Sequence, residues 1–360
     1  MRCTNNKIKT TVIGSFPKPE YLKIPDWFNL GTTSTTSNIE NNYFNNLPKD
    51  HNNNILRAIK EIISFKDSIG IDIIVDGEAR RSNYIHYHCR HLNGISFDKL
   101  TSKTARNNSY TFDAPTIISK ISPNKHFLLD EWKYNSSLTD KPIKVTIPGP
   151  MTIVDTVANL YYDNDEEMYD DIIEALNYEI LHLANNGCKY IQIDEPVFAR
   201  YPDNAVKFGI KNLERCFLNV PNDVTKIVHM CCGYPDKLDD IDYPKADNNL
   251  YIKLLELLDN TIIDQVSLED AHRFNDLSVL LPKAKRITVI LGVIGIARSR
   301  IETVEEIENR IYEALKYISH QQLVIAPDCG LGLLPIDICK KKLINMTSAV
   351  KNINNKLKLD

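Results

Sequence analysis

The chain has 360 residues, with 43% hydrophobic residues, 25% charged residues and a formal net charge of -4. These values are typical of a globular protein large enough for one barrel-sized domain or two small ones, and an acidic balance gives no field that would attract nucleic acid. No stretch approaches the ~20 apolar residues of a membrane span, and the first residues lack the apolar core of a signal peptide, so we expect no membrane segment and a cytoplasmic location.

Short apolar strands and polar segments alternate in the first part of the chain. Residues 9–15 predict a first strand, because Pro17 closes the turn that follows them. Residues 31–54 are rich in Thr, Ser and Asn and predict a polar loop. Isoleucines at helical spacing predict a helix over residues 55–69, and the run 71–76 predicts a second strand.

Residues 85–140 predict an insertion between the second and third strands. This stretch is polar and irregular, and we expect it to contain a hairpin and a helix near residues 130–132. It begins with an unusual group of histidines in residues 86–91.

The rest of the chain repeats a strand-then-helix pattern. An acidic-fronted helix is expected to end near residue 184, and another is expected over residues 304–318. The six further predicted strands cover residues 143–147, 189–193, 226–229, 261–268, 287–291 and 323–326.

Eight strands that alternate with helical segments predict an α/β fold of parallel strands joined by right-handed crossovers. We therefore expect a single-domain (β/α)8 TIM barrel spanning residues 1–360, with the excursion after strand two. In that fold the active site lies at the carboxyl ends of the strands, so residues at those ends are the candidates for chemistry.

The fifth predicted strand ends in a histidine, and a cysteine follows two positions later. In a strand, residues i and i+2 point the same way, so His229 and Cys231 face one point in space. Imidazole and thiolate are preferred Zn²⁺ ligands. The alternative is a buried histidine beside small apolar cysteines. Eight cysteines without a secretory signal favour thiols or metal thiolates over disulfides.

Two further candidate ligands follow other strands. Glu269 ends strand six and Cys329 follows strand eight. Taken singly, Glu269 reads as a helix cap or surface acid and Cys329 as a small residue in a turn. Together with His229 and Cys231 they make a plausible tetrahedral zinc set at the barrel rim.

Zinc can activate a bound water or hold a substrate thiol as a thiolate. Because cysteine ligands put negative charge on the metal, they weaken activation of water and leave a bound thiolate nucleophilic. This donor set therefore favours alkyl transfer to sulfur.

Three more strand-end residues suit the rest of a thiol-bearing amino acid. Glu78 and Asp194 are carboxylates that can bind an ammonium group, although a buried ion pair with Arg80 or Arg81 is an equal alternative. The backbone at Ser15 can receive a carboxylate through its amides.

These residues lie in motifs that resemble the C-terminal catalytic barrel of cobalamin-independent methionine synthase, in its short, single-barrel form. The match runs in the same order from about residue 10 to about residue 334. The resemblance implies zinc-dependent methyl transfer to homocysteine, zinc ligands at His229, Cys231, Glu269 and Cys329, and homocysteine contacts at Ser15, Glu78 and Asp194. The motifs are Ile13-Gly14-Ser15-Phe16-Pro17, Gly77-Glu78, Pro148-Gly149-Pro150-Met151-Thr152-Ile153, Ile193-Asp194-Glu195-Pro196, His229-Met230-Cys231, Leu268-Glu269 and Pro327-Asp328-Cys329-Gly330-Leu331.

The half of the site expected to bind the methyl donor departs from that family. The longer enzymes carry a second barrel, for which this chain has no room. The tryptophan that packs on the folate is missing from residues 154–156, and the histidine expected after strand seven is missing from residues 292–299. The donor is therefore expected to be methyltetrahydrofolate bound in a different way, a methylcorrinoid or another methyl carrier, with delivery by a second protein left open.

Tyr84, His88 and Arg298 are the candidates for this donor side, with Arg298 and Asp194 expected to act in catalysis. The histidine-rich stretch 86–91 is open to four interpretations: a second metal site, a donor pocket, a proton relay or loop packing.

Other functions remain in competition. A decarboxylase resembling uroporphyrinogen decarboxylase would not need the histidine, cysteine and glutamate set. A different zinc thiol alkyltransferase would use it on another substrate. A zinc hydrolase or aldolase-type lyase would want fewer thiolates, and a binding or storage protein would hold zinc or a corrinoid partner without turnover.

Overall fold

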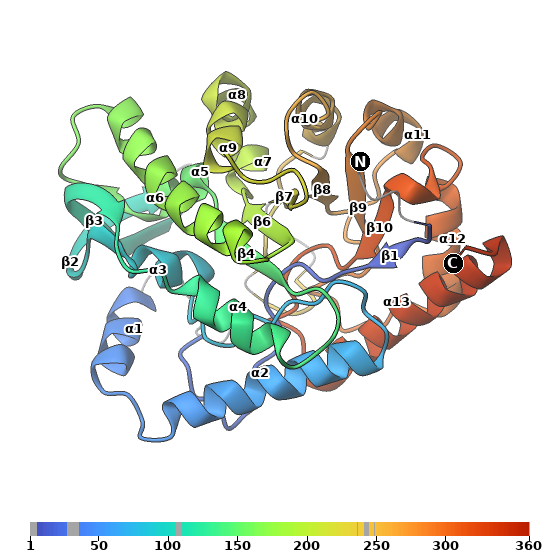
Figure 1. Cartoon of the computed structure of the whole chain (residues 1–360), viewed down its shortest axis with the longest axis horizontal. Coiled ribbons are helices and arrows are strands. Elements are labelled where there is room, and N and C mark those ends of the chain that lie inside the picture. Colours follow the sequence, from blue (N-terminus) through green and yellow to red (C-terminus); the bar gives the residue numbers. More distant parts are fainter. Residues whose placement is uncertain are drawn as a thin grey trace.

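The computed structural model describes residues 6–26, 36–105, 110–235, 237–240, 245–247 and 249–359. It has an α/β fold in which parallel strands occupy the middle and helices surround them (Figure 1). The strands are short and almost wholly buried, because both of their faces pack against apolar side chains.

Seven strands of the described residues form one parallel sheet in the order β1-β10-β9-β8-β7-β6-β4. From β10 to β4 the order follows the chain in reverse, as right-handed strand–helix–strand units require, and β1 pairs with the last strand, β10. The strands are β1 (Lys9–Thr10), β4 (Lys144–Pro148), β6 (Tyr190–Asp194), β7 (Thr225–Met230), β8 (Gln265–Leu268), β9 (Thr288–Gly292) and β10 (Leu323–Ala326).

The second predicted strand, residues 71–76, is reduced to single bridges on each side. Ile73 bridges Thr11, and Ile74 bridges Ile143, both in parallel. The amide of Ile74 donates to Pro142 (2.9 Å), and the Ile73 amide donates to Thr10 (3.1 Å). The segment thus connects β1 to β4, the two edges of the sheet.

The helices cover the sheet on the outside (Figure 1). The longer ones match the apolar periodicities of the sequence, although their ends differ by a few residues from those predicted. The helices are α1 (Thr36–Asn45), α2 (His51–Ser68), α3 (Tyr84–Cys89), α4 (Leu128–Ser136), α5 (Pro150–Thr156), α6 (Asp165–Asn185), α7 (Val197–Arg200), α8 (Pro202–Asn204), η2 (Ala205–Gly209), α9 (Ile210–Cys216), α10 (Leu250–Leu258), α11 (Leu277–Leu280), η3 (Leu281–Lys283), α12 (Val304–Ala314), η4 (His320–Gln322) and α13 (Ile336–Leu357).

The region between the second segment and β4 contains a long antiparallel hairpin. Its strands are β2 (Leu92–Ala105) and β3 (Tyr110–Pro123), and β3 also pairs with the short β5 (Ala158–Asn159). Lys103 Nζ donates to the carbonyls of Val154 (2.6 Å) and Val157 (2.7 Å). The hairpin is thereby fastened to the segment that follows β4.

The prediction of a polar loop over residues 31–54 was wrong for part of its length. Helix α1 lies within it and α2 begins at His51, while residues 31–35 lie outside the described part of the chain. The Ser37 hydroxyl donates to the carbonyl of Asp113 (2.9 Å), and the Asn41 amide donates to the carbonyl of Phe97. Polar contacts to the hairpin help to hold α1, and most of its residues are polar, so the sequence did not indicate a helix here.

Two other predicted elements differ from the structure. The strand predicted over residues 261–268 begins only at Gln265, since Thr261 lies in a turn. The sequence analysis also missed helix α5, which precedes α6.

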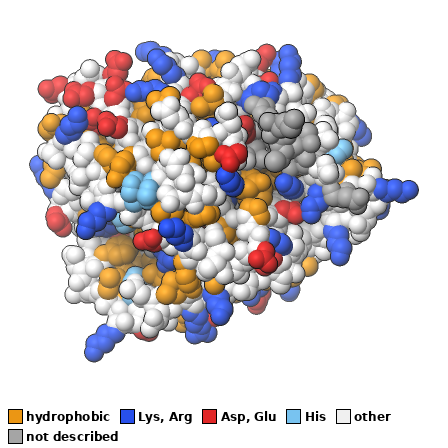
Figure 2. All heavy atoms as spheres, viewed as in Figure 1, with side chains coloured by type: hydrophobic (Ala, Val, Ile, Leu, Met, Phe, Trp, Pro, Cys, Tyr) orange, Lys and Arg blue, Asp and Glu red, His pale blue; other side chains and the backbone are white. Residues whose placement is uncertain are grey.

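Acidic side chains gather at the upper left of Figure 2, over the start of α6, whose first turn carries Asp165, Glu166 and Glu167. Within the described ranges, no helix combines the length and apolarity that a membrane crossing needs.

Candidate metal and substrate site

Strand register brings the predicted ligands together at the carboxyl ends of the sheet. His229 on β7 pairs with Asp194 on β6 and with Ser267 on β8. The ligand atoms of His229, Cys231 and Cys329 all lie within 4.8 Å of one another. One imidazole and two thiols from two different strand ends therefore converge on one point.

The orientation of His229 suits a metal ligand. Its Nδ1 lies 3.0 Å from the Ser267 hydroxyl, and its Nε2 lies 3.3 Å from the sulfur of Cys329. A hydrogen bond at one ring nitrogen fixes which nitrogen is presented to the other side. The ring is 3% exposed, so this orientation is held by the core.

The two cysteines form a coupled pair. A hydrogen bond with Cys329 lowers the pKa of Cys231 well below its ordinary value, and the same bond raises the pKa of Cys329. A shared hydrogen bond thus links the two sulfurs. The donor set of two sulfurs and one imidazole nitrogen fits Zn²⁺, and a fourth position would remain for another ligand.

Glu269, the fourth predicted ligand, does not belong to this group of converging ligand atoms. Its carboxylate forms an ion pair with Lys245 and accepts a hydrogen bond from the amide of Cys232 (3.0 Å). It is 4% exposed, so a buried carboxylate here needs a cationic partner, and Lys245 supplies one. The sequence placed Glu269 near the site but did not reveal this competing partner.

The cluster opens into a cavity of about 580 Å³. Of the ten residues proposed from the sequence as site residues, seven line it: Ser15, Glu78, Tyr84, Asp194, His229, Cys231 and Cys329. His88, Glu269 and Arg298 are not part of the lining. Further described residues in the wall come from helices α3, α5 and α7, from the hairpin and from the loops after β7; among them are Asn83, His86, Phe112, Asp155, Arg200, Tyr234, Lys245 and Asp247.

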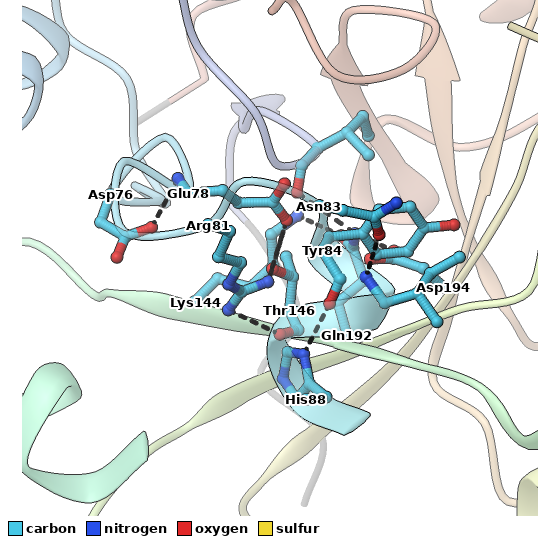
Figure 3. Close-up of polar contacts among 12 residues, drawn as sticks. Asp76, Glu78, Arg81, Asn83, Tyr84, His88, Lys144, Thr146, Gln192 and Asp194 are labelled. Atoms are coloured by element: carbon cyan, nitrogen blue, oxygen red, sulfur yellow. Dashed lines mark hydrogen bonds and ion pairs between the residues drawn. The ribbon is translucent and has the colours of Figure 1, made fainter. Parts of the chain in front are cut away.

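Glu78 is held in the cavity wall by two donors (Figure 3). Its Oε1 accepts hydrogen bonds from Arg81 Nη1 (3.1 Å) and from the Thr146 hydroxyl (2.8 Å). The ion pair with Arg81, which the sequence left as an alternative, therefore coexists with a place at the cavity. Glu78 has φ +55, and Gly14 leaves the space that its carboxylate fills, because a Cβ there would lie 2.7 Å from Oε1.

Asp194 rests on a chain of buried polar groups that also appears in Figure 3. The Nζ of Lys144 donates to Gln192 Oε1, and Gln192 Nε2 donates to Asp194 Oδ1 (2.7 Å). Because Lys144 occupies the amide oxygen, the amide nitrogen must face Asp194. Burial raises the pKa of Asp194 to about 7, and an incoming cation would favour its ionised form.

Lys144 and Gln192 were missed as supporting residues, although a signal for them exists. Both lie in predicted strands of a parallel sheet, which is normally buried on both faces, and a charged or amide side chain there requires a buried partner. That Lys144 on β4 would pair with Gln192 on β6 had no such signal, because this pairing depends on the register of the two strands.

The three candidates for the donor side lie in different surroundings. Tyr84 lines the cavity, and burial raises its pKa well above the ordinary value, so the phenol stays protonated. The Nδ1 of His88 lies 2.8 Å from the Tyr84 carbonyl, and its ring packs edge-on against Phe127 rather than in the cavity wall. Arg298 is exposed and donates to the carbonyl of His272 (2.8 Å).

His272 contacts the segment 292–299, which itself contains no histidine. It follows β8, and its Nε2 accepts hydrogen bonds from the amides of Ile296 (2.8 Å) and Ala297 (3.2 Å). Burial lowers the pKa of His272 to about 3, helped by the positive charges of Lys245 and Arg298. An acceptor nitrogen with two amide donors cannot also release a proton.

The lowered pKa of His272 predicts that the folded protein loses stability as the pH falls. Between pH 6.5 and about 3 the unfolded chain binds a proton at His272 and the folded chain does not. Its contribution is therefore complete above pH 6.5 and is lost as the pH falls. Urea unfolding at pH 7 and pH 5 should show the stability advantage of the wild type over His272→Gln shrinking at the lower pH. An advantage of equal size at both pH values would contradict this.

The sequence matches a known protein family and is similar to named proteins over nearly its whole length. Residues 8–352 match the family described as the catalytic domain of cobalamin-independent synthase. A methionine synthase from Thermococcus kodakarensis is 30% identical over 353 residues, which cover 97% of this chain and 94% of that protein. A methionine synthase from Sulfurisphaera tokodaii is 27% identical, with 98% and 94% covered.

A solved structure is similar over nearly its whole length. The B12-independent methionine synthase from Shewanella sp. W3-18-1, in complex with selenomethionine, matches with a TM-score of 0.84 and 26% identity, covering 98% of this chain and 99% of that one. A structure from Listeria monocytogenes, a putative vitamin-B12 independent methionine synthase, matches with a TM-score of 0.69 at 18% identity and supports the fold alone.

Proposed function

Because the chain belongs to the cobalamin-independent methionine synthase family and is therefore a methyltransferase, we propose that it transfers a methyl group to the thiol of homocysteine in a zinc-dependent reaction. The observation that carries this proposal is the convergence of His229, Cys231 and Cys329 in the wall of a cavity that Glu78 and Asp194 also line.

In this proposal the three residues hold the zinc ion, which when bound keeps the homocysteine sulfur as a nucleophilic thiolate. Glu269 is the fourth ligand only if its carboxylate leaves Lys245, with which it pairs in this structure. The side chains of the protein bind and orient the substrate.

The substrate's amino-acid end is assigned to the other side of the cavity. Glu78 and Asp194 bind the ammonium group, since both carboxylates line the cavity and are held by buried donors. Ser15 receives the carboxylate end through the nearby backbone. Binding at both ends leaves the sulfur directed at the metal and excludes thiols that lack the amino-acid group. The similar Shewanella protein was solved with selenomethionine, the selenium analogue of the expected product.

The methyl donor is proposed to occupy the part of the cavity near the hairpin. Phe112 of β3 lines the cavity there, as does the ion pair between Arg200 and Asp155 (3.0 Å). Phe112 can supply the aromatic surface that is missing from residues 154–156. The two donor classes proposed for this place are methyltetrahydrofolate and a methylcorrinoid.

We further infer that the sheet closes into a (β/α)8 barrel. The inference is supported by the bridges that join residues 73–74 to both β1 and β4. The cysteines of the described residues are free thiols, which favours a reducing, cytoplasmic setting for a zinc–thiolate enzyme.

The first test combines metal analysis with zinc-edge X-ray absorption on the purified protein. We expect about one zinc per chain and one additional sulfur neighbour when homocysteine is added. Product formation from homocysteine is then measured with each donor. Zinc whose surroundings ignore homocysteine, or a protein that binds no zinc, would refute the thiol-transfer proposal and favour the decarboxylase or storage alternatives.

A further inference from the structure

One buried amide connects the two parts of the cavity wall that are assigned to the amino-acid end of the substrate. Gln192 on β6 is 0% exposed. Its Nε2 donates to Asp194 Oδ1 (2.7 Å) and to the carbonyl of Ile13 (3.2 Å). Asp194 is the proposed ammonium contact, and Ile13 lies two residues before Ser15, where the carboxylate is proposed to bind. The two hydrogens of a single NH2 group therefore link both contacts.

Lys144 determines which way this amide points. Its Nζ donates to Gln192 Oε1, and Lys144 itself is 2% exposed (Figure 3). Thr146, two residues after Lys144, pairs in register with Gln192, so the two side chains share one face of the sheet. The Asp194 carboxylate and the Ile13 carbonyl accept hydrogen bonds, whereas Lys144 donates one. Only one orientation of the amide satisfies all three neighbours.

This arrangement leaves one oxygen of Asp194 for the substrate. Gln192 occupies Oδ1, and among the described residues no hydrogen bond is formed by Oδ2. Asp194 also pairs in register with His229, so its carboxylate lies beside the strand end that carries the zinc cluster. Glu78 differs, because its Oε1 already forms an ion pair with Arg81 (3.1 Å). Selection for an ammonium group therefore depends mainly on where Asp194 is held.

We propose that Lys144 and Gln192 are positioning residues that make the site select thiols bearing an α-amino group. This inference rests on the proposed function. Neither side chain belongs to the cavity lining, so both act through Asp194 and the backbone at Ile13 rather than by touching the substrate. Without the bridge, the Asp194 carboxylate is free to turn, and the ammonium contact weakens while the contact of the sulfur with zinc is kept.

Binding of two thiols to the zinc-loaded protein measures this selectivity. Homocysteine and 4-mercaptobutyrate differ only in the α-amino group, and titration calorimetry of both requires no methyl donor. We expect the wild type to bind homocysteine at least about 10-fold more tightly, the effect of a hydrogen bond to a charged group. Lys144→Met is expected to remove most of this preference by weakening homocysteine binding, with the affinity for 4-mercaptobutyrate unchanged.

Lys226→Met is the matched control for the loss of a buried lysine. Lys226 also lies on a strand of the parallel sheet, β7, and is 6% exposed. Its Nζ lies 3.3 Å from the carbonyl of Val224, and the residue does not line the cavity. This variant should keep the preference of the wild type for homocysteine.

A double variant guards against misfolding of the single one. Lys144→Met combined with Gln192→Leu replaces both members of the hydrogen-bonded pair by apolar side chains of similar size, which costs less than leaving one partner alone. We expect it to retain zinc and to lose the preference for homocysteine as fully as Lys144→Met.

Three results would contradict these expectations in different ways. A wild-type preference in both variants, or an equal loss of affinity for both thiols, would overturn the positioning role and leave the proposed function intact. A wild type that binds both thiols equally would overturn the ammonium contact on which the inference is built. A wild type that binds neither thiol would refute the proposed function itself.

Discussion

Replacing Cys329 with serine is expected to remove bound zinc and nearly all methyl transfer to homocysteine. The sulfur of Cys329 lies 3.3 Å from His229 Nε2 and is hydrogen-bonded to Cys231, so its loss takes away one donor of a three-donor cluster. A serine hydroxyl is a poor replacement, because it does not ionise at neutral pH as a coordinated thiol does. Changing groups outside the ligand shell already costs about 10- to 100-fold, so we expect more than about 100-fold here.

Metal content by mass spectrometry and methionine formation measure this effect together. Cys339→Ala is the matched control, since Cys339 is fully buried on α13 and lies outside the cavity. That variant should retain about one zinc per chain. If Cys329→Ser kept its zinc and its activity, the cluster would not be the metal site.

Replacing Asp328 with alanine is expected to give the largest loss of stability. Asp328 is 0% exposed, and its carboxylate accepts hydrogen bonds from the amides of Asp270 (2.8 Å), Ala271 (2.8 Å) and His272 (2.7 Å). Each buried amide left without an acceptor costs about 1–3 kcal/mol, so we expect a loss of about 3–5 kcal/mol. The same change should also weaken zinc binding, because Cys329 is the next residue.

Urea unfolding of the wild type, Asp328→Ala and Asp328→Asn checks this expectation. The asparagine retains one acceptor oxygen and should lie between the other two proteins. Asp276→Ala is the matched control, since Asp276 also accepts a backbone amide, that of Ser278 (3.0 Å), but at an exposed helix start. A loss in Asp328→Ala no larger than in this control would show that the three amides find other partners.

The strand ends and the ligand types could be predicted from the sequence because both are local properties. An apolar run that stops at His229, with Cys231 two positions on, determines which way two side chains point. The same reasoning put Cys329, Glu78 and Asp194 at strand ends, and all of these residues line the cavity.

What the sequence could not decide depends on contacts between distant segments. Glu269 has the right position along the chain, but its carboxylate pairs with Lys245 from another loop. Helix α1 is mostly polar, and polar contacts with a hairpin more than fifty residues away help to hold it in place.

Glu40 pairs with His86 because the contacts of α1 with the hairpin position the helix that carries Glu40. Periodicity and residue type are therefore enough to predict the strands and the chemistry of the ligands. The partner of each buried charge was decided only by the tertiary structure, because burial makes a charge depend on whichever group the fold brings within hydrogen-bond distance.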